Sequence, residues 1–166
     1  VVPLLEKIVR EHANPLARIH ALWTLQGLDA ATPELVRAKM ADANPQVRSN
    51  AIRVSETLFR QGDASFQADI ERLGADSDPG VALQSVMTAK YLAWPEHVKF
   101  ISGMAAKTSA KGVKDLGLQL IQPGQQQGEM SDKQRLVMKK GQEIYTSLCA
   151  ACHELDGKGA EVAGAV

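Results

Sequence analysis

The feature that most constrains the fold is a short motif, Asn or Asp followed by Pro, that occurs three times. The copies begin at Asn14, Asn44 and Asp78, at spacings of 30 and then 34 residues. The copies align without gaps beyond the motif, and small and apolar positions recur in one register: Ala21, Ala51 and Ser85; Leu22, Ile52 and Val86; Leu28, Leu58 and Leu92. An internal repeat of this length predicts a chain built from stacked copies of one structural unit.

Each motif predicts the start of a helix. The Asn or Asp side chain accepts a hydrogen bond from a free backbone N–H of the first turn, and Pro fits the first helical position. Apolar residues follow at helical spacing, as Val47, Ala51, Val54 and Leu58 do. The segments between the motifs supply a partner helix for each. We therefore predict an all-α fold of about four helix pairs over residues 1–121, whose remaining helices cover 2–11, 33–40, 65–73, 95–107 and 110–121.

Two glycines and two tryptophans inside the predicted repeats bear on the predicted helices and their packing. Gly112 and Gly117 weaken the prediction of the last helix, because each costs about 1 kcal/mol relative to Ala in a helix interior. Trp23 and Trp94 lie in or beside repeat helices, and we predict that they pack between repeats.

An arginine follows the proline by three residues in the first two copies, at Arg18 and Arg48. Asp42 and Asp76 precede the second helices, and we expect them to accept hydrogen bonds from these arginines; Ala82 interrupts the series. Helix pairs of this length and opening resemble HEAT-like repeats over residues 1–121. The resemblance implies a right-handed solenoid that serves as a spacer or a docking surface, or that is purely structural.

A polar segment rich in Gln and Gly, residues 122–130, predicts a linker between domains. A new helix is predicted to begin at Ser131, which can form a capping box with Gln134, and to continue towards Cys149. We therefore place the repeats at 1–121, the linker at 122–130 and the first part of a second domain at 131–166.

The second domain contains the motif Cys149-Ala150-Ala151-Cys152-His153. Two thiols three positions apart can form thioether bonds to the two vinyl groups of one haem, and the His after the second Cys can bind the iron as the proximal ligand. Two alternatives stay open. A thioredoxin-like redox dithiol needs a strand before the motif, where a helix is predicted, and a zinc site needs a fourth ligand, which neither the linker nor the tail supplies.

The surroundings of the motif resemble the N-terminal part of class I cytochromes c. Gly141 stands eight residues before Cys149, Tyr145 stands four before it, and an Asp-Gly-Lys-Gly run follows from Asp156. The resemblance implies covalently attached haem c held by Cys149, Cys152 and His153. Because only 13 residues follow His153, we expect the cytochrome domain to be truncated and the distal ligand to be absent from this chain. We therefore expect this chain alone to hold haem poorly. Met130 and Met138 precede the motif and do not match that ligand.

Composition narrows the choice of partner. Lys plus Arg and Asp plus Glu both number 19, and this balance argues against nucleic acid or an anionic membrane surface. No apolar run approaches the roughly 18 residues of a membrane-spanning helix, and a disulfide framework is excluded because Cys149 and Cys152 are the only cysteines.

HEAT-like repeats followed by a cytochrome c domain resemble the C-terminal half of large secreted bacterial haem proteins, in which a dehydrogenase-like domain often comes first. The resemblance implies electron transfer in the periplasm or elsewhere outside the cytoplasm, with a redox partner protein or a fused dehydrogenase domain as partner. We identify no catalytic residue in this chain. The alternative function is a helical-repeat module for protein–protein interaction that binds no haem.

Overall fold

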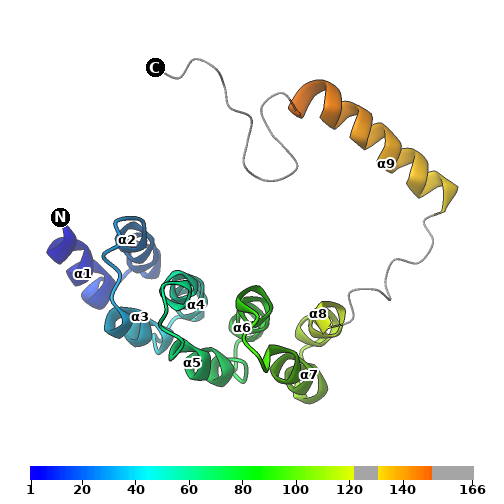
Figure 1. Ribbon diagram of the computed structural model, residues 1–166. Helices are drawn as coiled ribbons and strands as arrows, with labels where there is room; N and C mark the ends of the chain where they lie inside the picture. The colour runs from blue at the N-terminus through cyan, green and yellow to red at the C-terminus, as the bar shows by residue number, and fades with distance from the viewer. Residues whose placement is uncertain (122–130, 151–166) are drawn as a thin grey trace. The chain divides into compact units, whose positions relative to one another are not determined.

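The computed structural model describes residues 1–121 and 131–150. All regular structure in these two ranges is helical, which confirms the predicted all-α fold. The repeat region forms four helix pairs (Figure 1), with the bounds α1 Val2–Glu11, α2 Pro15–Gly27, α3 Pro33–Met40, α4 Pro45–Arg60, α5 Phe66–Leu73, α6 Pro79–Leu92, α7 His97–Lys107 and α8 Lys111–Ile121. The chain divides into two units, Val1–Pro123 and Gly124–Val166. The predicted limits of the linker stay a prediction, because residues 122–130 lie outside the described ranges.

The eight helices of the first unit lie in two rows (Figure 1). Helices α2, α4, α6 and α8 form one row in which each helix contacts the next, and α1, α3 and α5 contact one another in the same manner in the other row. Helix α7 packs against α6 and α8. The two helices of each pair also contact each other, so the unit is a stack of helix pairs. The HEAT-like identity of these pairs stays a prediction.

The core lies where the two rows meet. It is one continuous cluster, and all four pairs contribute to it, with fully buried side chains at Leu22, Leu25, Leu35, Ile52, Phe66, Ile70, Val86 and Ile101. Burial of each such side chain stabilises the fold by about 1.5–3 kcal/mol. The face predicted for the third pair is confirmed, since Phe66, Ile70 and Leu73 are all buried.

The Asn or Asp side chain of each repeated motif caps the helix that follows it, as predicted. The side chain of Asn14 accepts a hydrogen bond from the Leu16 N–H at 2.9 Å, and the side chains of Asn44 and Asp78 each accept two bonds from the first turns of α4 and α6. The fourth pair has no such motif. There the Thr108 hydroxyl accepts from the Ala110 N–H at 3.1 Å, just before α8 begins.

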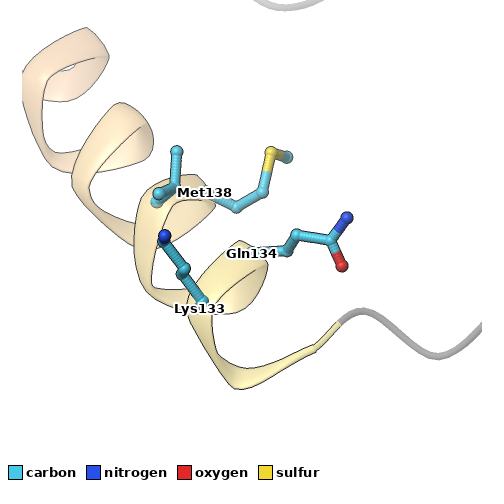
Figure 2. A pocket seen from close by; sticks show the side chains of 4 residues that line it. Lys133, Gln134 and Met138 are labelled. Atoms are coloured by element: carbon cyan, nitrogen blue, oxygen red, sulfur yellow. The ribbon is translucent and has the colours of Figure 1, made fainter.

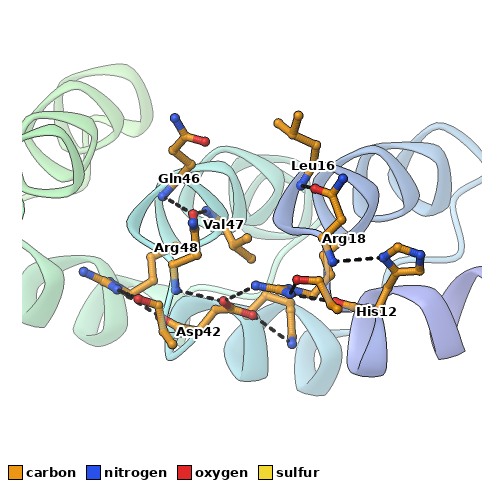
Figure 3. Close-up of polar contacts among 12 residues, drawn as sticks. His12, Leu16, Arg18, Asp42, Gln46, Val47 and Arg48 are labelled. Carbon is orange, nitrogen blue, oxygen red and sulfur yellow. Dashed lines mark hydrogen bonds and ion pairs between the residues drawn. The ribbon is translucent and has the colours of Figure 1, made fainter.

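Arginine side chains link neighbouring pairs (Figure 3). Arg18 Nη2 lies 2.9 Å from Asp42 Oδ1, and Arg48 Nη2 lies 2.7 Å from Asp76 Oδ1. Each guanidinium also donates to two backbone carbonyls in the loop that precedes its own helix. The expected pairing of the arginines with Asp42 and Asp76 is therefore present, and it ends at Ala82, which is buried in the third pair.

Three of the predicted helices begin later than expected, and the one predicted over 65–73 begins at Phe66. The helix predicted over 95–107 begins at His97, because the residues before it form a turn in which the His97 N–H donates to the Trp94 carbonyl at 3.0 Å. The last helix begins at Lys111. Its Gly117 has a packing role, since a Cβ at this position would lie 3.1 Å from Ala105 Cβ of α7. A glycine that weakens the helix locally thus permits close contact between α7 and α8.

The two tryptophans differ in their surroundings. Trp94 is buried between Phe59 and Phe100, with ring centroids 6.2 and 6.1 Å away, so its predicted packing role is confirmed. Trp23 is 37% exposed, and its indole N–H donates to Asn50 Oδ1 of the next pair at 2.8 Å. It therefore links two repeats from the surface rather than from the core.

Candidate functional site

The second unit contains α9, Asp132–Ile144, which is followed by the turn that carries the first cysteine of the motif. The Ser131 N–H donates to Gln134 Oε1 at 2.9 Å, and the Gln134 N–H donates to Ser131 Oγ at 3.3 Å. This is the predicted capping box, with both of its hydrogen bonds formed. The first turn of α9 is thus fixed by residues next to it in the sequence.

Apolar side chains of α9 and of the turn after it are exposed. Within the described residues of this unit no side chain of α9 is buried, and the exposed fractions are 57% for Ile144 and 75% for Leu148. Leu136, Val137 and Met138, nearer the start of the helix, are between 55 and 63% exposed. Gly141 and Tyr145 are one helical turn apart, and nothing lies within 4 Å of the point where a Cβ on Gly141 would stand. The helix therefore offers an apolar surface together with a position open to close approach.

The helix widens into a π-helical turn over Tyr145–Cys149. Its defining hydrogen bond runs from the Ala150 N–H to the Tyr145 carbonyl, at 2.8 Å and five residues apart. Such single π-turns occur often at functional sites. The turn carries Cys149 at its last position, where the free thiol is half-buried and follows the exposed side chain of Leu148.

The other two predicted haem-binding residues, Cys152 and His153, lie outside the residues that the structure describes. Their assignment stays a prediction, as does the absence of a distal ligand from the chain. Met138, which we did not assign as that ligand, is 62% exposed on α9.

A shallow apolar depression lies on the first turns of α9 (Figure 2). It measures about 370 Å³, and the side chains of Lys133, Gln134, Val137 and Met138 line it. Cys149 is at the opposite end of the helix, so this depression is no part of the thiol's immediate surroundings. A single helix forms all of its wall, and we treat it as part of the exposed apolar surface.

The rest of the described chain contains no competing metal site. Across residues 1–121 and 131–150, no three His, Cys, Asp or Glu side chains come together in a way that could hold an ion. His12 accepts a hydrogen bond from the Asn14 N–H, and His97 contacts the Trp94 carbonyl, so both take part in local turns. None of the helices in the same two ranges has the length and apolar character required to cross a membrane.

Comparison with known families supports a cytochrome c domain in the C-terminal region. The sequence model of the family Cytochrome c matches residues 138–164, a range that contains the whole cysteine motif. No curated protein and no solved structure matches the chain. Domains of the matched family bind haem covalently and transfer electrons in general.

The described part of the motif fits haem attachment. Covalent attachment requires a thiol that the porphyrin can reach, and Cys149 is unbonded and partly exposed. A porphyrin also requires apolar contact. Ile144 and Leu148, within five residues of that thiol, leave more than half of their surface uncovered. The thiol and the apolar side chains therefore offer the two kinds of contact that the group needs.

Proposed function

We propose that the C-terminal unit attaches haem c and transfers electrons. Cys149 and Cys152 would hold the porphyrin by thioether bonds, and His153 would bind the iron as the proximal ligand. When bound, haem supplies a one-electron redox couple. The observation that carries the proposal is the free, partly exposed Cys149 at the end of the π-turn, within the range matched by the Cytochrome c family.

The chain's own residues have separate tasks in this proposal. The capping box fixes the start of α9, and the π-turn at its other end presents the Cys149 thiol beside Leu148. Leu148 and Ile144 would cover part of the porphyrin and keep water from it, which is one way in which a protein tunes a haem potential.

The wider setting follows from the same proposal. Attachment of haem c takes place outside the cytoplasm, so we propose a periplasmic or other extracytoplasmic location. The electron partner would be a redox protein or a fused dehydrogenase domain. Residues 1–121 would act as a HEAT-like spacer or docking surface, 122–130 as the linker and 131–166 as the first part of the cytochrome domain.

The test is production of the chain in bacteria that also express a cytochrome c maturation system. We expect a Soret band that survives acid–acetone extraction. Cys149→Ser should shift the pyridine haemochrome band because only one thioether remains, and Cys149→Ser with Cys152→Ser should abolish covalent attachment. His153→Ala should remove the proximal ligand, whereas Met138→Leu, at an exposed position on α9, should leave the spectrum unchanged.

Two results would overturn the proposal. If the chain stays colourless in cells that mature a known cytochrome c, the helical-repeat interaction module becomes the better assignment. If the chain stays colourless and Cys149 and Cys152 form a reversible disulfide with a measurable potential, the motif is a redox dithiol.

A further inference from the structure

Over the first three helix pairs, the two helix rows differ in net charge. Helices α1, α3 and α5 together contain five acidic and five basic residues. Helices α2, α4 and α6, which contact one another in order, contain five basic residues and one acidic residue, Glu56. The balanced charge of the whole chain conceals this difference between the rows.

Part of the positive charge is neutralised inside the fold. Arg18 and Arg48 form the ion pairs with loop aspartates shown in Figure 3. Glu56 is 5% exposed, and it accepts hydrogen bonds from Thr88 at 2.5 Å and from Arg53 at 2.8 Å. The Glu56 carboxylate therefore lies inside the fold.

Three basic side chains remain at the surface of α2, α4 and α6. Arg53 keeps 47% of its side chain exposed despite its bond to Glu56, Arg60 is exposed, and Lys90 is half-buried. The surface that α2, α4 and α6 present to solvent is thus positive, and we call it the basic face.

Large apolar and aromatic side chains share the basic face. Trp23, Met87 and Tyr91 are 37, 45 and 54% exposed. Trp23, Arg53 and Met87 occupy the same position in three successive repeats, since the spacings of 30 and 34 residues relate them. At this repeat position the side chain is therefore aromatic in the first helix pair, cationic in the second and apolar in the third.

Hydrogen bonds hold three side chains of the basic face, Trp23, Arg60 and Tyr91, in place in the absence of a partner. The Trp23 indole N–H donates to Asn50 Oδ1 on the next helix of the row. Arg60 Nη1 donates to the Tyr91 hydroxyl at 2.8 Å, and the guanidinium carbon lies 6.0 Å from the centre of the Tyr91 ring. Side chains fixed in this way lose little conformational entropy on binding.

We propose that the basic face binds an acidic segment of a partner protein that carries apolar side chains between its carboxylates. The carboxylates would meet Arg53, Arg60 and Lys90, and the apolar side chains would pack on Trp23 and on the exposed Met87 and Tyr91. Trp, Tyr and Arg are the residues that contribute most to protein–protein binding energy. Three surface cations interleaved with Met and Trp suit a peptide better than a phosphate backbone, which selects for a larger basic excess.

The test uses the 166-residue chain and a fluorescein-labelled peptide in which glutamates alternate with leucine and phenylalanine. Fluorescence anisotropy should show saturable binding that weakens as salt is added. Arg60→Gln with Lys90→Gln should raise the Kd about tenfold, and Trp23→Ala should have a similar effect. Lys7→Gln with Lys99→Gln, which removes the same charge from exposed positions on α1 and α7, should change the Kd less than about twofold.

Circular dichroism melting of each variant separates loss of binding from loss of folding. The proposal fails if the acidic peptide does not bind the wild-type chain, or if the two double variants weaken binding equally. It also fails if a single-stranded oligonucleotide binds more tightly than the peptide and is lost with Arg60→Gln and Lys90→Gln. Cys149→Ser with Cys152→Ser should leave peptide binding unchanged, so this result and that of the haem experiment are independent.

Discussion

The ion pair between the second and third helix pairs gives the sharpest stability prediction. Arg48 donates to both carboxylate oxygens of Asp76, at 2.7 and 2.8 Å, and to two backbone carbonyls at 2.9 and 3.1 Å. The two side chains are only 15 and 9% exposed. Replacement of Arg48 by Met keeps most of the apolar stem and removes the guanidinium. The variant therefore leaves Asp76 as a nearly buried carboxylate with no basic partner from α4.

The size of the effect follows from burial. Removing one partner of a buried ion pair costs about 3–5 kcal/mol, whereas an exposed pair contributes about 0–1 kcal/mol. Because this pair is mostly buried and bidentate, we expect Arg48→Met to lower the free energy of unfolding by about 2–3 kcal/mol. The melting temperature of a unit of this size falls by about 4 °C for each kcal/mol lost. We therefore expect a fall of about 10 °C.

Denaturation by urea, followed by far-UV circular dichroism, measures this difference. The matched control is Lys111→Met, which breaks the pair with Asp115 on α8, where the side chains are 87 and 55% exposed. We expect the control to lose less than about 0.5 kcal/mol. Equal losses in the two variants, or no loss in Arg48→Met, would refute the conclusion that this pair links the helix pairs.

The pH dependence of stability provides a second test of the Arg48–Asp76 ion pair. Burial alone raises the pKa of Asp76, but hydrogen bonds from Arg48 and from the Asp78 N–H outweigh it, so the pKa lies below its ordinary value. A lowered pKa stabilises the fold above the unfolded-state value of about 3.9, and this contribution is lost as the pH falls through the folded value. The difference in free energy of unfolding between wild type and Arg48→Met should therefore be largest at pH 7 and should shrink in acid. If this difference stays constant as the pH falls well below the unfolded-state pKa, the proposed cause is contradicted.

Three further predictions concern the third junction of the stack and the packing of two glycines. Ala82→Arg combined with Thr108→Asp should restore an ion pair where the arginine series ends and should raise the free energy of unfolding by about 1 kcal/mol, measured by urea denaturation. Gly74→Ala should destabilise the unit by about 1–3 kcal/mol, because a Cβ there would lie 2.7 Å from the Phe100 ring. Gly103→Ala, where nothing lies within 4 Å, should instead raise the melting temperature, since Ala favours the helix by about 1 kcal/mol.

The helix pairs could be predicted because their signals are local. An Asn or Asp side chain caps the helix that starts beside it, so the positions of Asn14 and Asn44 mark the starts of α2 and α4 directly. The later start of α7 was missed because the turn at Trp94 depends on a backbone hydrogen bond that leaves no mark in the sequence. The position of Gly117 was read as a weakness because its contact with Ala105 joins two helices and is not a property of either alone.

The candidate site was only partly predictable. Its residue types and spacing were visible in the sequence. The π-turn over Tyr145–Cys149 was not, because one hydrogen bond that spans five residues instead of four scarcely alters the side-chain periodicity. The basic face was missed for a different reason. The net charge of zero averages over helices that alternate between the two rows, and a count of charges helix by helix would have revealed the difference.

The two units of the chain differ in the source of their stability. The repeat unit has a continuous core to which all four pairs contribute, so its helices stabilise one another. Helix α9 has its capping box and no buried side chain among the described residues, and a helix of 13 residues is marginal without tertiary contacts. Its apolar positions, Ile144 and Leu148, lie close to the thiol that is proposed to hold haem. Covalent attachment at Cys149 would bring an apolar surface to the side chains that lack one, and in this proposal the chemistry of the site and the packing of α9 depend on each other.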